Sequence, residues 1–287
     1  MTTPDEPRFP RRGVHGAVAR YLESMPDLAG KVVVDIPCGD GRASAIFHRK
    51  GALVRALDLF PGAMRASGIV AEAADMSATL PLADASADVV LCQEGIEHVP
   101  DQLHLLAELN RVLKPGGLLI LTTPSLSHMR ARLAQLAFES DSLRRMPPNE
   151  LEGILVAGSS VDQLYFGHLF LRGVQHLRAI MALSGFKVRR RLWTDLTLSS
   201  LLMGVLLYPL LLPATAYTVI RHRLKQRGVP GPALAQIWRE QALINLSPTT
   251  LFCRHVFWEM QKEAGVRERR GEILGLGTGI GPYRQAR

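Results

Sequence analysis

The sequence has few of the features that mark disulfide-rich, zinc-binding or secreted proteins. Its 287 residues include only 3 cysteines, Cys38, Cys92 and Cys253, which lie far apart and lack the spacing of metal ligands. We expect them to be buried, reduced thiols, as in a cytosolic protein. The polar, proline-rich residues 1–13 have no apolar core, which argues against a signal peptide, and no internal repeat is evident. These absences predict a cytoplasmic protein.

The chain also has fewer acidic residues than basic ones. The chain has 26 Asp and Glu against 34 Lys and Arg, which gives a formal net charge of +8. The basic residues cluster at 10–13, 189–191, 221–227 and 267–270. Clustered positive charge favours an anionic partner, namely a membrane surface, nucleic acid or a phosphorylated substrate. Any single cluster is more typical of a solvated surface, so charge alone does not select a partner.

The stretch VVVDIPCGDGRAS, residues 32–44, joins a strand to a helix through a loop with two glycines. Residues 31–36 are apolar and rich in valine, which predicts a strand buried on both faces of a parallel sheet. Gly39 and Gly41 let the loop backbone approach a ligand closely. Because ligands bind outside the carboxyl ends of such strands, this loop is a candidate ligand site, although many Gly-x-Gly turns are merely tight turns.

A second apolar stretch, residues 52–60, carries Asp58 near its end. An acidic residue at this position accepts hydrogen bonds from ribose hydroxyls, and dinucleotide enzymes share the spacing. Periodicity predicts further strands at 69–74, 87–93, 118–124, 186–193 and 251–262, and helices at 14–24, 41–50, 101–113 and 168–184. This alternation predicts an α/β protein with a mostly parallel sheet.

The residues that carry these features resemble class I S-adenosylmethionine-dependent methyltransferases of the type 11, small-molecule kind. The matching stretches are VVDIPCGDGRAS, Asp58, residues 73–101 and LNRVLKPGGLLILTTPS at 109–125. The resemblance is close over 28–125 and loose over 168–193. It implies a Rossmann-like sheet of seven strands whose last strand runs antiparallel. It also implies S-adenosylmethionine as cofactor and S-adenosylhomocysteine as product.

The resemblance places the cofactor at the carboxyl ends of the first, second and fourth strands. The expected cofactor-binding residues are Asp35, Pro37, Gly39, Gly41, Asp58, Leu59, Asp75, Met76 and Gln93. Asp35 would orient the loop and the cofactor's amino group, and Asp58 would accept the ribose hydroxyls. Asp75 and Met76 would flank the adenine, and Gln93 would lie next to the methyl donor. The family usually has glycine at Pro37, so we expect the loop to differ slightly there.

The stretch QEGIEHVPD directly follows the fourth predicted strand and leaves three roles open. Glu97 and His98 are structural residues in one interpretation. In another, Glu94, Glu97 and His98 bind a divalent cation, as in the metal-dependent O-methyltransferases of ubiquinone synthesis and small-RNA end methylation, which this stretch resembles. We favour a third, in which His98 is the general base, Glu97 assists it and no metal is bound.

Residues 196–220 form the longest apolar run and carry no charge over 25 residues. The length suits a membrane span, but the predicted strands on either side belong to one sheet, so the chain must return to the side that it left. Pro209 and Pro213 interrupt the run, which favours a re-entrant or monotopic hairpin with the basic run 221–227 on anionic head groups. The alternative is a buried helical pair or a dimer interface.

These observations divide the chain into an arm and helix (1–27), a methyltransferase domain (28–195 and 248–264, with a helical cap at 125–167), an apolar and basic insertion between the last two strands (196–247), and a mobile tail (265–287). The predicted function is O-methylation of a small or lipid-linked acceptor at the inner membrane surface. Two alternatives are a soluble, dimeric methyltransferase for a diffusible metabolite and a non-catalytic S-adenosylmethionine-binding partner protein. No nucleic-acid module is recognised, so nucleic acid is not a predicted partner.

Overall fold

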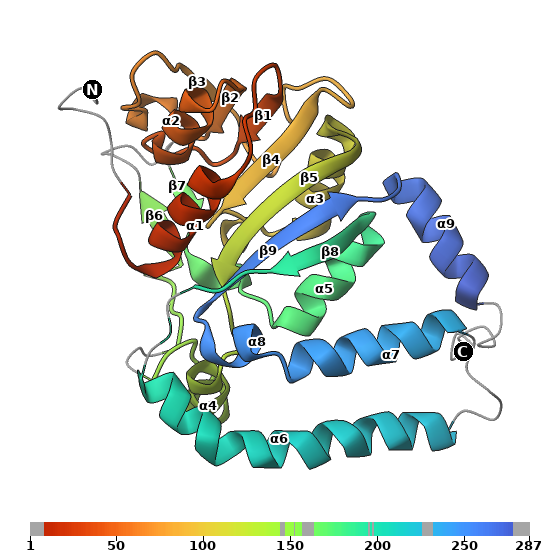
Figure 1. The fold of residues 1–287 in the computed structure, drawn as a ribbon. Helices are drawn as coiled ribbons and strands as arrows, with labels where there is room; N and C mark the ends of the chain where they lie inside the picture. The colour runs from red at the N-terminus through yellow and green to blue at the C-terminus, as the bar shows by residue number, and fades with distance from the viewer. Residues whose placement is uncertain are drawn as a thin grey trace.

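A computed structural model describes residues 9–143, 147–151, 153–156, 164–194, 196, 198–225 and 232–277. Seven strands form one sheet in the order β3-β2-β1-β4-β5-β9-β8 (Figure 1). Their bounds are β1 Val32–Asp35, β2 Leu53–Asp58, β3 Ala71–Ala73, β4 Ala87–Gln93, β5 Leu113–Pro124, β8 Phe186–Arg191 and β9 His255–Lys262. The predicted seven-stranded, Rossmann-like sheet is therefore confirmed.

The direction of the strands also matches the prediction. Strands β3, β2, β1, β4 and β5 pair in parallel, whereas β9 runs antiparallel to both β5 and β8. The chain passes from β1 to β2 on one side, and β4 lies on the other side of β1. This reversal of strand order leaves a crevice beyond the carboxyl ends of β1 and β4, where ligands bind in doubly wound sheets.

Helices cover both faces of the sheet because successive strand residues point to opposite sides. Val33 packs with helices α1 (Gly13–Ser24) and α2 (Arg42–Arg49) in one core cluster. Its neighbour Val34 belongs to the other cluster, which includes helices α3 (Gln102–Val112) and α5 (Val174–Leu183). The two cores hold the strand ends, and with them the crevice, in a fixed arrangement.

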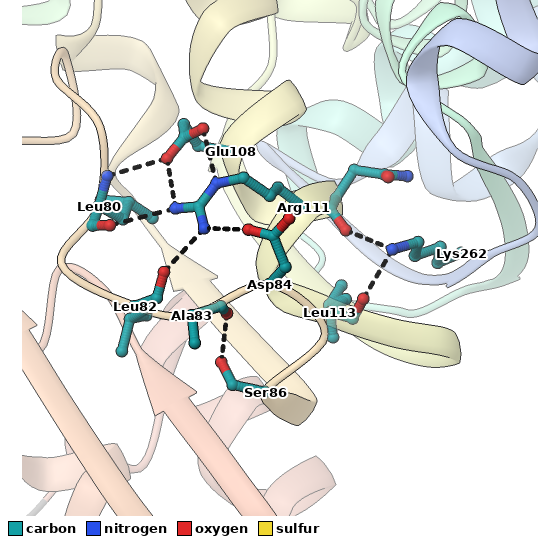
Figure 2. A network of polar contacts seen from close by, with 10 residues as sticks. Leu80, Leu82, Ala83, Asp84, Ser86, Glu108, Arg111, Leu113 and Lys262 are labelled. Carbon is teal, nitrogen blue, oxygen red and sulfur yellow. Dashed lines mark hydrogen bonds and ion pairs between the residues drawn. The ribbon is translucent and has the colours of Figure 1, made fainter.

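Arg111 fastens the loop before β4 to helix α3 (Figure 2). Its guanidinium donates to the Leu82 carbonyl at 2.7 Å and to the Leu80 carbonyl at 3.1 Å, and it pairs with Glu108 and Asp84. Charged hydrogen bonds to several partners at once make this contact stronger than a single surface ion pair. The loop that leads into β4 is therefore held at the end of the sheet opposite to the crevice.

The cap over 125–167 is only partly helical. Helix α4 (Met129–Phe138) is followed by a two-stranded antiparallel sheet of β6 (Ile154–Val156) and β7 (Leu164–Phe166). The 3-10 helix η4 (His168–Phe170) then leads to α5. The expectation of a helical cap thus holds for α4 and is wrong for β6 and β7, whose strands are too short for periodicity to reveal.

The insertion lies between β8 and β9 and is helical, as predicted, but it does not turn at its prolines. Helix α6 (Leu198–Lys225) is continuous through Pro209 and Pro213. Only leucines lie between the two prolines, so no Gly, Asn or Asp is available to form a turn. The chain returns instead along α7 (Pro232–Asn245), which lies between α6 and α5, while the first part of α6 contacts α4 and α8 (Figure 1).

Two further boundaries differ from the prediction. The expected strand 251–262 begins only at His255, because Pro248–Phe252 form helix α8 with proline in its first turn. The expected mobile tail at 265–287 begins with helix α9 (Val266–Gly277), and residues 278–287 lie outside the described part of the chain. Both differences concern the periphery of the domain rather than the crevice.

Candidate cofactor site and active site

A cavity of about 640 Å³ lies at the carboxyl ends of β1, β2 and β4. Ten of the candidate residues from the sequence line it, namely Asp35, Pro37, Gly39, Asp58, Leu59, Asp75, Met76, Gln93, Glu94 and His98. Gly41 and Glu97 do not line it. Gly41 begins helix α2 with a φ of 83° and faces Met64 and Ala66, so its role is to shape the loop.

Asp58 is held rigidly at the tip of β2. Its Oδ2 accepts a hydrogen bond from the Gly39 amide and its Oδ1 accepts one from the Phe60 amide, each at 2.8 Å. A carboxylate offers about four lone-pair sites, so both oxygens can still accept hydrogen bonds from a ligand. The side chain is 7% exposed and lines the cavity. An oriented carboxylate with free acceptor capacity fits a ribose with two hydroxyls.

Asp35 lies below the loop and is fully buried at the end of β1. The Ser44 hydroxyl donates to its Oδ2 at 2.6 Å. Burial raises the pKa of Asp35 to about 7, and the neighbouring negative charges of Asp58 and Asp40 add to the effect. A carboxyl group that is poised near neutral pH gains charge readily when a cation approaches. This environment suits a cationic ligand such as one that carries an ammonium or sulfonium group.

His98 lies at the side of the cavity, and its tautomer is set by the cap. Its Nδ1 lies 2.6 Å from the Phe166 carbonyl oxygen, so this nitrogen must carry the proton that it donates. The Nε2 of the neutral ring is then an acceptor. Tyr165 lies edge-on to the ring with centroids 5.6 Å apart. The cap therefore holds His98 in the tautomer that a general base requires.

Glu97 precedes His98 in the chain but does not line the cavity. It is fully buried, and its Oε2 accepts a hydrogen bond from the Thr123 hydroxyl at 2.9 Å. Burial raises the pKa of Glu97, and the charge of Glu94 raises it further. One ligand atom each from Glu97, His98 and His168 lie within 4.8 Å of one another. His168 thus takes the place that Glu94 had in the expected metal set.

Several residues of the cavity have no clear signal in the sequence. His15, from helix α1, lines it, and its Nδ1 accepts from the Gln93 amide. Burial lowers the pKa of His15, which keeps this ring neutral. Phe60 and Tyr165 both line the cavity, with ring centroids 5.6 Å apart. The helical pattern of 14–24 predicted α1, but it does not show which residue faces a ligand.

The comparisons with known proteins agree with this geometry. Residues 34–121 match the family model described as "Methyltransferase domain". The ubiquinone biosynthesis O-methyltransferase of Xanthomonas euvesicatoria is 32% identical over 156 residues, which cover 50% of this chain and 63% of the relative. The enzyme of the same name from Cupriavidus pinatubonensis is 36% identical over 112 residues, covering 36% and 45% respectively. The chain therefore spans less than two thirds of the length of these relatives.

A solved structure shows the same fold. It is a Listeria monocytogenes protein assigned to the S-adenosylmethionine-dependent methyltransferases, with a TM-score of 0.50 and 13% identity, covering 87% of this chain and 98% of that one. Residues 34–121 match the methyltransferase domain and the chain shares the fold of the Listeria protein, which agrees with the S-adenosylmethionine cofactor expected from the sequence. The cavity residues fit that cofactor, because Asp58 offers acceptors for a ribose and Asp35 a carboxyl for a cation.

Proposed function

We propose that the protein is an S-adenosylmethionine-dependent O-methyltransferase that works at the cytoplasmic face of a membrane on a small or lipid-linked acceptor. The observation that carries the methyltransferase assignment is the Asp58 carboxylate, oriented by two backbone amides at the wall of the cavity. The names of the curated relatives support oxygen as the methylated atom. When bound, the cofactor supplies an electrophilic methyl group.

The protein's own residues would position the acceptor and remove its proton. His98 presents Nε2 as the acceptor for a hydroxyl proton, while its Nδ1 stays bonded to the Phe166 carbonyl. Phe60 and Tyr165 line the cavity with neighbouring rings and would help to exclude water from a bound acceptor. Glu97 is buried, with a carboxylate oxygen within 4.8 Å of a His98 ring nitrogen, and is a positioning residue in this arrangement. The expected rate gain from one such base is about 10²–10⁴-fold.

Calorimetric titration of S-adenosylhomocysteine into the full chain tests the cofactor assignment. We expect one site per chain and a loss of affinity of about tenfold or more in Asp58→Asn, because the amide replaces one acceptor oxygen with a donor. Asp84→Asn, which changes an exposed carboxyl outside the cavity, is the matched control and should bind normally. Absence of binding to the unaltered chain would refute the assignment.

The membrane part of the proposal rests on the surface of helix α6. Ser199–Arg221 is long and apolar enough to cross a membrane by length and composition, yet only 11% of it is buried. Its exposed apolar residues include Leu202, Val205, Leu206 and Leu210, which are 63–74% exposed. An apolar face of this size on the outer side of the protein is expected to meet lipid or another protein. The basic run 221–227 at its end favours an anionic lipid surface.

The neighbouring helix argues that α6 lies along the surface rather than across the membrane. Helix α7 packs beside α6 and contains Arg239 and Glu240, so it is too polar to return through the hydrocarbon. The strands on either side of the insertion, β8 and β9, pair within one sheet. A helix that lies in the interface leaves both strands on the same side of the bilayer.

Vesicle flotation tests this placement. We expect the full chain to float with vesicles of phosphatidylcholine and phosphatidylglycerol, and part of this binding to survive high salt. Val205→Glu should reduce the bound fraction about tenfold, because it removes apolar area and adds repulsion from anionic lipid. Val70→Glu is the control, since Val70 is 84% exposed at the opposite end of the sheet near β3. Equal binding by both variants, or no flotation, would refute membrane docking through α6.

A further inference from the structure

A second cavity, of about 210 Å³, lies at the carboxyl end of β5 and is distinct from the cofactor cavity. Cationic and titratable side chains dominate its lining: His128, Arg130, His168, Arg254 and His255, with Asp141 as the carboxylate among the described lining residues. These side chains come from the start of α4, the loop that follows α4, the 3-10 helix η4 and the start of β9. Segments distant in sequence thus converge on one positively charged pocket.

The electrostatics of this second cavity favour an anion. Burial lowers the pKa of His128 to about 4, and the neighbouring positive charges of Arg254 and Arg130 add to the effect. Helix α4 begins at His128, so its positive end also lies at this cavity. In the part of the chain that the structure describes, the Arg254 guanidinium makes no ion pair or hydrogen bond. A positive pocket with an available guanidinium suits a ligand with several negative oxygens.

Two side-chain pairs connect this cavity with the cofactor cavity. His168 lines the second cavity and its ring lies 5.2 Å from that of His98, which lines the first. His255 lines the second cavity, and its Nε2 lies 3.3 Å from Oε2 of Glu94, which lines the first. A molecule held in the second cavity is therefore separated from the candidate base by one layer of side chains.

The same cavity also borders the proposed membrane helix. Arg130 lines it and donates a hydrogen bond to the Ser199 hydroxyl, in the first turn of α6, at 3.1 Å. An anionic group at the membrane surface would thus meet this cavity near the start of the helix that rests on lipid. The position between the candidate base and α6 is the one that the charged end of an acceptor would occupy.

We propose that the second cavity binds a phosphate group of the methyl acceptor, so that the acceptor's hydroxyl is directed towards His98. This inference rests on the proposed methyltransferase function. It narrows the acceptor to compounds that carry a phosphate, either the headgroup of a lipid or a soluble phosphate ester. Arg254 and Arg130 are the residues assigned to the phosphate oxygens, and His128, which precedes the first turn of α4, lines the same cavity.

The experiment is a calorimetric titration of inorganic phosphate into the full chain saturated with S-adenosylhomocysteine, at constant ionic strength. Saturable binding at one site is expected, and Arg254→Gln should weaken it roughly tenfold. Arg130→Gln should weaken it as well, which guards against an effect peculiar to one variant. Arg267→Gln removes an exposed arginine on α9 that does not line the cavity, and it should bind phosphate normally.

Each outcome decides a separate question. If S-adenosylhomocysteine fails to bind, the proposed function is wrong, whatever phosphate does. If it binds but phosphate does not, or if phosphate binds equally to the three variants, the phosphate site is refuted and the methyltransferase proposal stands. If phosphate binds as expected, flotation with vesicles that contain either phosphatidic acid or phosphatidylglycerol identifies the source. A preference for phosphatidic acid that Arg254→Gln removes indicates a lipid acceptor, and no preference indicates a soluble phosphate ester.

Discussion

Replacing Asp35 by asparagine should stabilise the ligand-free protein while it weakens cofactor binding. The Asp35 carboxyl is fully buried, and its pKa rises from 3.8 to about 7. Between these values the folded protein binds more protons at this group than the unfolded chain does. Its stability therefore falls as the pH rises from about 4 to 7, and it stays at the lower level above 7.

The size of the effect follows from the pKa. A tenfold change in the ionisation constant corresponds to about 1.4 kcal/mol, so ionised Asp35 destabilises the fold by up to about 4 kcal/mol at pH 8. Asparagine keeps an oxygen that accepts from the Ser44 hydroxyl and carries no charge. Asp35→Asn should thus raise the free energy of unfolding at pH 8, and this gain should shrink by about 2.5 kcal/mol at pH 5.

Urea denaturation of both chains at pH 5 and pH 8, without ligand, measures this difference. Asp75→Asn, at an exposed position on the same cavity, is the control and should change stability little at either pH. A gain from Asp35→Asn that is equal at the two pH values would refute the reasoning from burial. A loss of stability at pH 8 would refute it as well. Calorimetry should also show that the affinity of the unaltered chain for S-adenosylmethionine falls below pH 7, as Asp35 becomes protonated.

Three further variations probe the site and the loop. His98→Ala should lower the methyl-transfer rate about 10²-fold or more and leave the affinity for S-adenosylhomocysteine unchanged, as measured by kinetics and calorimetry. A chelator should leave the methyl-transfer rate unchanged; a loss that Mg²⁺ restores would show that His98 is a metal ligand instead. Gly41→Ala should lower the free energy of unfolding, measured by urea denaturation, by about 2–4 kcal/mol. The added methyl group would overlap with Met64, and a φ of 83° is unfavourable for alanine. Gly13→Ala, with a φ of 76° and open space around it, should cost only about 1 kcal/mol; equal losses would contradict the packing argument.

The strands of the sheet were predictable because buried parallel strands are apolar runs with clear ends. Residues 31–36 and 87–93 were expected as strands, and β1 and β4 lie within these bounds. Most of the expected cofactor residues directly follow such strands, so the carboxyl edge of the sheet brings them together. Local sequence was sufficient for this part of the site because topology alone fixes where strand ends meet.

Other parts of the site depend on contacts between distant segments. The cap strand β7 supplies the carbonyl that sets the tautomer of His98, although 68 residues separate the two in sequence. A strand of only three residues is too short for its hydrophobic pattern to be recognised in the sequence. Helix α6 shows the opposite difficulty: proline predicts a break, but tertiary contacts and the absence of turn residues keep the helix continuous. Glu97 was expected to assist His98, and the sequence does not show that one turn of 3-10 helix places its carboxylate against the Thr123 hydroxyl.

A crystal structure of the full chain grown with S-adenosylhomocysteine tests most directly whether this cavity holds the cofactor. We expect the nucleoside in the cavity of about 640 Å³, with its ribose hydroxyls on Asp58 and its sulfur on the side of Gln93 and His98. A nucleoside bound elsewhere would refute the cofactor site. So would one in this cavity whose ribose does not contact Asp58.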